Sequence, residues 1–153
     1  MTHNLTDFDG GIFVKKEQKA SILLGRGFFY VYFGKNRKGC EGMQLELNRE
    51  GGHLTAALIG ELDHHAAADL RQRIDTAVLS CRPRRLTIDL ERLTFMDSSG
   101  IGLIMGRYRL MVSLGGEVRL SGTSPRMERV IRLAGLDKLP IWDERKDVCE
   151  TNQ

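Results

Sequence analysis

The fold is constrained most by a change between two hydrophobic periods along residues 44–142. Runs in which every second residue is apolar predict strands, and segments with apolar residues three or four apart predict helices. Two alternating runs on either side of a Glu-Gly-Gly turn at residues 50–52 predict a hairpin over residues 44–60. The later strands are expected at residues 86–90, 118–120 and 141–142.

Helices are expected between these strands, because the intervening segments have a helical period and recognisable start signals. Asp63 can cap the first helix, and Asp97 precedes the second. Ser124-Pro125 opens the third helix, and Gly135 is placed to end it. The apolar faces of the first two helices consist of Leu70, Ile74, Ala77 and Val78, and of Ile101, Ile104, Met105, Tyr108 and Met111.

Two glycines, Gly102 and Gly106, share one face of the second helix. Glycine costs roughly 1 kcal/mol relative to alanine inside a helix, so the pair predicts a close approach of this helix to its sheet. The element order ββαβαβαβ indicates an α/β fold, with a small mixed β-sheet and helices packed mainly on one face.

Composition and charge limit the function classes. The chain has 153 residues and a formal net charge of +3. Residues 1–42 hold seven basic and four acidic residues, a net charge of +3, so the charges of residues 43–153 sum to zero. The main body therefore has no excess of basic residues for nucleic-acid binding. No secretory signal follows Met1, and the three cysteines (Cys40, Cys81 and Cys149) lack the spacing of a zinc site, so we expect reduced thiols in a cytoplasmic protein.

The first 42 residues differ in composition from the rest, with five of the six phenylalanines and more lysine than arginine. Their apolar stretch at 20–34 is shorter than the roughly 20 residues of a membrane span, and Arg26 interrupts it. It could be an added strand, a membrane-surface anchor or a partner-binding arm. Because lysine and phenylalanine have A/T-rich codons, we interpret residues 1–42 as translated upstream sequence or a disordered extension. Met43 would then start a domain at 43–142, followed by a tail at 143–153.

The segment FMDSSGIGLIMGRYRLM, residues 95–111, places Asp97, Ser98 and Ser99 directly at the start of the second helix. Short polar residues at this position commonly cap a helix. A second explanation is that one hydroxyl is presented for modification. The residues by themselves leave both explanations open.

Four segments then resemble a known family. GELDHH (60–65), LTFMDSSGIGLIMGRYR (93–109), GGEVRLSGTSP (115–125) and LAGLDKL (133–139) occur in the same order in STAS-domain anti-sigma-factor antagonists, particularly the SpoIIAA-like sporulation type. The resemblance covers about residues 43–142 and implies the STAS (SpoIIAA-like) fold. Residues 1–42 have no counterpart in the family, and the tail 143–153 is shorter than the family's final helix.

The resemblance implies a partner switch in transcription control. Such proteins, when unphosphorylated, bind an anti-sigma factor that is also a serine kinase, and the sigma factor is released. The kinase then phosphorylates the second serine of the motif, here Ser99, and a serine phosphatase reverses this. We expect no catalytic residue, cofactor, metal, direct nucleic-acid contact or membrane contact. The expected partner-binding residues are Asp63, Asp97, Ser98, Gly100, Thr123 and Ser124.

The same residues allow other interpretations. His64-His65 invites a metal or catalytic-base role, but adjacent side chains diverge on a strand or a helix. A hydrolase triad of Ser99, His64 and Asp63 lacks the G-x-S-x-G elbow. The remaining alternative is a STAS module that senses a ligand or signals outside sigma control.

Overall fold

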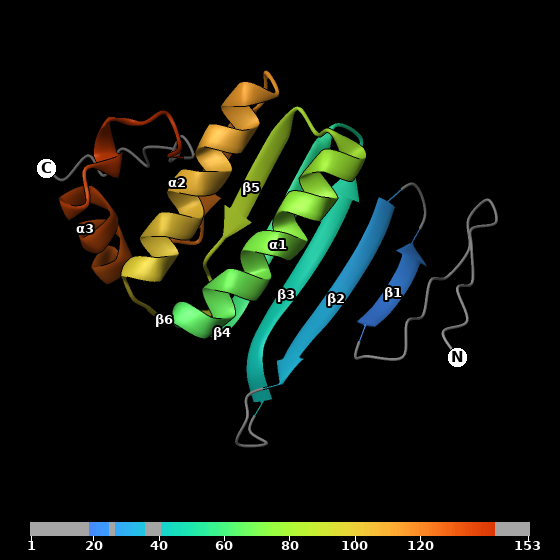
Figure 1. Ribbon diagram of the computed structural model, residues 1–153, viewed down its shortest axis with the longest axis horizontal. Coiled ribbons are helices and arrows are strands. Elements are labelled where there is room, and N and C mark those ends of the chain that lie inside the picture. Colours follow the sequence, from blue (N-terminus) through green and yellow to red (C-terminus); the bar gives the residue numbers. More distant parts are fainter. Residues whose placement is uncertain (1–18, 25–26, 36–40, 143–153) are drawn as a thin grey trace, which may run out of the picture.

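The computed structural model describes residues 19–24, 27–35 and 41–142. Within these ranges, three α-helices lie on one face of a seven-stranded mixed sheet, and β1 and β2 extend the sheet beyond them (Figure 1). The strands are β1 (Lys19–Leu24), β2 (Gly27–Lys35), β3 (Glu41–Glu50), β4 (His53–Leu62), β5 (Arg85–Asp89), β6 (Leu93–Met96) and β7 (Glu117–Ser121). The helices are α1 (His64–Cys81), α2 (Ser98–Ser113) and α3 (Pro125–Leu133), followed by the short 3-10 helix η1 (Leu136–Lys138).

The predicted hairpin is β3–β4, and it is confirmed. Its strands pair antiparallel from Gln44–Ile59 to Glu50–His53, and Gly51 takes a positive φ of 57° in the turn. On the other side of β3, β2 and then β1 extend the sheet with antiparallel pairing, so an added strand is the alternative that agrees with the backbone of residues 19–24 and 27–35. A natural start at Met43 stays a prediction.

Parallel pairing elsewhere in the sheet brings the starts of the three helices to the same edge. β4 pairs parallel with β5 and with β6, and β5 pairs parallel with β7. The carboxyl ends of β4, β6 and β7 therefore lie at one edge, and α1, α2 and α3 each start just after one of these ends. Figure 1 shows the first turns of α1 and α2 beside each other at that edge.

The core lies between the helices and the sheet face that they cover. Alternate residues of the strands are buried there, as predicted for Leu86 and Ile88 on β5 and for Val118 and Leu120 on β7. The predicted apolar faces of α1 and α2 point into the same layer, with Ala77, Ile101, Met105 and Tyr108 partly buried at its margin. The fully buried side chains include Leu45, Leu58, Leu62, Leu70, Ile74, Leu103, Ile104, Met111 and Ile131.

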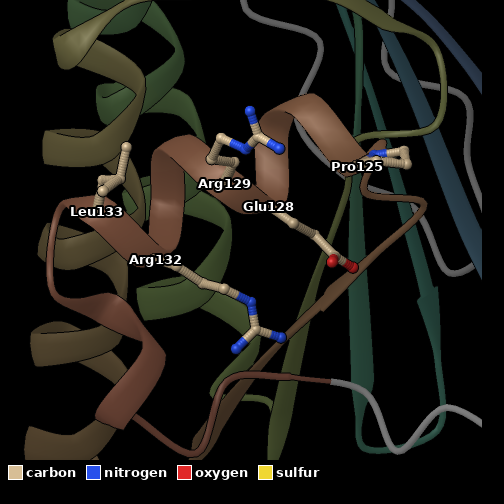
Figure 2. A pocket seen from close by; sticks show the side chains of 5 residues that line it. All are labelled: Pro125, Glu128, Arg129, Arg132 and Leu133. Carbon is tan, nitrogen blue, oxygen red and sulfur yellow. The ribbon is translucent and has the colours of Figure 1, made fainter.

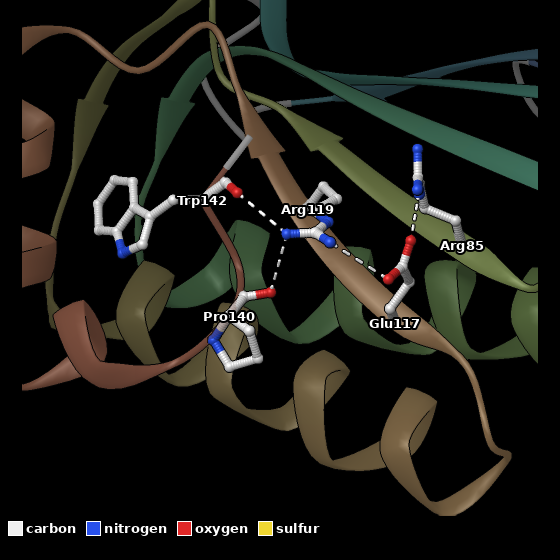
Figure 3. Close-up of polar contacts among 5 residues, drawn as sticks. All are labelled: Arg85, Glu117, Arg119, Pro140 and Trp142. Atoms are coloured by element: carbon white, nitrogen blue, oxygen red, sulfur yellow. Dashed lines mark hydrogen bonds and ion pairs between the residues drawn. The ribbon is translucent and has the colours of Figure 1, made fainter. Parts of the chain in front are cut away.

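On the opposite face of the sheet, β5 and β7 carry polar side chains. Figure 3 shows Glu117 on β7 between Arg85 and Arg119, with hydrogen bonds from both guanidinium groups. Arg119 also donates to the carbonyl oxygens of Pro140 and Trp142, at 3.4 and 3.1 Å, and so fixes the segment after η1. None of the three α-helices of the described residues covers this face (Figure 1).

One ion pair is buried between α1 and α2. Arg107 on α2 is only 4% exposed, and its Nε and Nη2 lie 2.6 and 3.0 Å from the carboxylate oxygens of Asp75 on α1. Burial is the largest influence on both groups: it raises the pKa of Asp75 and lowers the pKa of Arg107, against the attraction between them. The apolar period of α2 does not predict this arginine in the helix interface.

Three predictions about the fold are corrected. The chain forms the extra strand β6 before α2, whereas residues 141–142 form only an isolated bridge, Leu120 with Trp142. The two glycines of α2 do not permit close packing, because a Cβ atom at Gly102 or Gly106 would meet nothing within 4 Å. The expected tail at 143–153, with its question of a final helix, and Cys40 lie outside the described residues.

Candidate functional site

Three capped helix starts form the candidate site at the edge where β4, β6 and β7 end. The Asp63 carboxylate accepts a hydrogen bond from the Ala66 amide at 2.8 Å and caps α1, as predicted. Ser124 caps α3 by accepting from the Met127 amide at 3.2 Å. Each helix therefore begins with its first free N–H groups partly satisfied by a side chain from the preceding loop.

Asp97, not Ser98 or Ser99, is the cap of α2. Its carboxylate accepts from the Ser99 amide at 2.7 Å, and its own amide donates to the Leu62 carbonyl at the end of β4, at 3.4 Å. Ser98 and Ser99 are the first two residues of the helix itself, so neither hydroxyl is the cap. Ser98 is exposed and Ser99 is half-buried.

Gly100 fixes the path of the chain immediately after the serines. It is buried, and a Cβ atom added there would lie 2.1 Å from Cγ and 2.5 Å from Sδ of Met96, with Leu62 Cδ2 at 3.0 Å. Ordinary carbon contacts are near 3.5–4.0 Å, so only glycine fits without rearrangement. This close packing against β4 and β6 holds the serine-bearing turn at the sheet edge.

The hydroxyl of Ser99 faces a histidine from the neighbouring helix. Its Oγ lies 3.4 Å from Nδ1 of His64, the first residue of α1. The ring of His65 is 5.9 Å from that of His64, in an edge-to-face arrangement. The rejected hydrolase triad had paired these two residues, but their separation of 35 positions gives no local signal that they meet.

The same geometry argues against a hydrolase. Asp63 uses its carboxylate to cap α1, and no hydrogen bond among the described residues joins it to His64. A serine hydrolase needs its carboxylate to orient the histidine, and it needs donors for an oxyanion. Within the described ranges, no group of three metal-ligating side chains is placed to hold a metal ion.

Thr123 and Ser124 share the sheet edge with Ser99 but do not bond to it. Thr123 donates through Oγ1 to Glu128 at 3.1 Å, within the first turn of α3. No hydrogen bond of the described residues joins Thr123 or Ser124 to Ser99. A partner would have to be broad enough to contact both helix starts.

Phe95 is an exposed aromatic residue beside the site that sequence analysis missed. Its side chain is 47% exposed on β6, two residues before the cap Asp97. Simple alternation would place it on the same face as the buried Leu93, but the pairing of β6 with β4 shifts register between Gly60 and Glu61. A register shift of this kind is not visible in the sequence.

The outer face of α3 carries a shallow groove of about 360 Å³ (Figure 2). Its lining residues, Pro125, Glu128, Arg129, Arg132 and Leu133, all belong to this one helix. Small-molecule sites normally enclose most of a ligand between several elements, which this groove does not do. In the described part of the chain, no helix is long and apolar enough to cross a membrane.

The chain is similar to known proteins over the region of this site. The family model described as the STAS domain matches residues 44–148. The "Anti-sigma F factor antagonist" of Paenibacillus polymyxa is 38% identical over 102 residues, which cover 66% of this chain and 87% of that protein.

Two solved structures agree with this relationship. One is the anti-sigma factor antagonist SpoIIAA in its unphosphorylated form, with 35% identity and a TM-score of 0.59, covering 65% of this chain and 85% of that one. The other is the Bacillus cell fate determinant SpoIIAA in the phosphorylated form, with 36% identity and a TM-score of 0.55, covering 65% and 88%. The resemblance seen in the four sequence motifs is thereby confirmed, and the chain belongs to the STAS-domain family.

Proposed function

We propose that this protein is an anti-sigma factor antagonist that works by partner switching in the cytoplasm, in the control of sporulation. Its unphosphorylated form binds an anti-sigma factor that is also a serine kinase, and the sigma factor is released. Phosphorylation of Ser99 ends this binding, and a serine phosphatase restores it. The protein is the effector and the kinase substrate in this scheme, not an enzyme.

The observation that carries the proposal is that Asp97, not a serine, caps α2. The Ser99 hydroxyl is therefore not needed to complete the helix, and it stands half-buried at the edge formed by three helix starts. A relative named as an antagonist, and a SpoIIAA structure solved in a phosphorylated form, support phosphorylation as the modification. The residue itself remains our proposal.

A phosphate at this position is compatible with the fold. It would add a charge of about −1.5 to −2 at the start of α2, where the helix dipole favours an anion by typically 0.3–1 kcal/mol. The free N–H groups of the first turn are also suited to phosphate oxygens. Phosphorylation should therefore leave the domain folded, and its effect must act at the partner surface.

The loss of partner binding follows from the local charge. A thousandfold weaker complex requires about 4 kcal/mol. A dianion on Ser99 would lie close to the Asp97 carboxylate, which is 2.7 Å from the Ser99 amide, and burying both under a partner is costly. We accordingly place Ser99 inside the interface, together with Asp63, Asp97, Ser98, Gly100, Thr123 and Ser124.

The modified residue can be tested directly with the cognate anti-sigma kinase, ATP and Mg²⁺. We expect mass spectrometry to find phosphate on Ser99 in the parent and in Ser98→Ala, and none in Ser99→Ala. Modification of Ser98 alone, or of neither serine, would contradict the proposal.

The switch itself can be tested with a binding measurement on the unmodified kinase. Ser99→Asp should bind at least tenfold more weakly than the parent, because it places a charge at the proposed interface. Ser113→Asp is a matched control, since it makes the same change on the same helix at the exposed opposite end. Equal affinity of Ser99→Asp and the parent would show that the interface lies elsewhere.

A further inference from the structure

His64 and Ser99 belong to different helices, and their polar atoms face each other across the starts of α1 and α2. The separation of 3.4 Å between Nδ1 and Oγ is longer than the roughly 2.7–3.2 Å usual for a hydrogen bond between nitrogen and oxygen. His64 is exposed, so its ring can move without breaking any core packing. The contact is therefore loose in the unmodified protein, and it would suit a larger acceptor.

Phosphorylation changes what Ser99 offers to the imidazole. The phosphoryl group replaces the hydroxyl proton, so a group that can donate or accept becomes an anion whose oxygens are strong acceptors. The phosphate oxygens also extend beyond the position of Oγ, toward neighbouring side chains. An imidazole facing such a group binds it best when Nδ1 carries a proton, and a charged donor makes the stronger bond.

We propose that His64 is the intramolecular partner of the phosphoryl group on Ser99, so that the phosphate joins the first turns of α1 and α2. The proposal deepens the function given above, and it rests on that function for the identity of the modified serine. Its own basis is the Nδ1–Oγ juxtaposition, with His64 exposed and Ser99 half-buried. His65, next in sequence, has its ring centre 5.9 Å from that of His64, and no hydrogen bond of the described residues joins it to Ser99.

The carboxylates near His64 and Ser99 affect both the phosphate and the imidazole. Asp63 on α1 and Asp97 on α2 are both engaged as helix caps, and Glu61 at the end of β4 is exposed. These carboxylates repel a phosphate and attract an imidazolium. The His64 imidazolium would thus offset part of the added negative charge in the modified protein, and it would no longer be available to a partner.

The test uses the full chain with phosphoserine installed at position 99 during translation, so that no kinase is required. We expect NMR of the imidazole nitrogens to show that, at a fixed pH, the ratio of protonated to neutral His64 rises about tenfold on phosphorylation. His65 serves as the internal control. The logarithm of its ratio of protonated to neutral imidazole should rise by less than half as much as that of His64. An unchanged His64, or equal changes at both histidines, would overturn the proposal.

A second measurement observes the phosphate. In the phosphorylated protein, His64→Gln should shift the second ionisation of the phosphate, followed by ³¹P NMR, to higher pH, because the adjacent cation is lost. His65→Gln should leave it in place, and an equal response of both variants would refute the pairing. If the kinase assay instead places the natural modification on another residue, the proposed function fails while this physical result still stands.

Discussion

The replacement Gly100→Ala tests how closely the serine-bearing turn is fitted to the sheet. The added Cβ would be 2.1 Å from Cγ of Met96. The helix start cannot relieve this contact by shifting toward Leu62, because Leu62 is fully buried and its Cδ2 would already be 3.0 Å away. Over-packing of this kind typically costs 1–3 kcal/mol. Part of this is offset, because alanine favours a helix by up to about 1 kcal/mol over glycine. We expect a net loss of about 1–2 kcal/mol in the free energy of unfolding.

Gly102→Ala is the matched control, two residues later on the same helix. A Cβ atom there meets nothing within 4 Å, so only the propensity gain remains, and this variant should be more stable than the parent by up to about 1 kcal/mol. The free energies of urea unfolding of the two variants should therefore differ by about 1–3 kcal/mol, with opposite signs relative to the parent. Equal stability of the two variants would show that the turn yields easily and that Gly100 does not position Ser99.

Three further predictions concern the ion pair, the sheet face and the partner surface. Arg107→Ala should cost about 3 kcal/mol in urea unfolding, because it leaves Asp75 without its buried partner, and Asp75→Leu in the same chain should restore most of the loss. The hydrogen bond from Arg85 lowers the pKa of Glu117 below its ordinary value of 4.5, so its stabilisation is present at neutral pH and is lost as the pH falls through the folded-state value. Glu117→Gln should accordingly be less stable than the parent at pH 7, and unfolding curves at acid pH should show the gap closing; a constant gap would contradict this. Phe95→Ala should weaken binding of the anti-sigma kinase roughly tenfold or more without changing stability, and an unchanged affinity in calorimetry would place Phe95 outside the interface.

Much of the fold was predictable because local signals agreed with each other. The hairpin turn at residues 50–52, the cap Asp63 and the Ser124-Pro125 start each lie where the sequence placed them. β6 was missed because it has only four residues and no alternating burial. The role of the α2 glycines was misjudged, since a helical period cannot tell a face against the sheet from an open one.

The site was less predictable than the fold. The motif and the resemblance brought attention to Ser99, but the choice of Asp97 as the cap depends on backbone geometry. The contact between Ser99 and His64 depends on two parallel strands bringing separate helix starts together. Long-range juxtapositions of this kind leave no local pattern in one sequence.

The Asp75–Arg107 pair has a consequence beyond stability. Asp75 lies eleven residues after His64 and Arg107 eight after Ser99, so the pair is about 12–16 Å along each helix from the site. Because this ion pair joins the two helices, it resists a displacement of α1 along α2. A substitution of Asp75 or Arg107 that left the domain folded would then alter the position of His64 relative to Ser99. Such a variant would show a signalling defect although the substituted residue lies far from the proposed partner contacts.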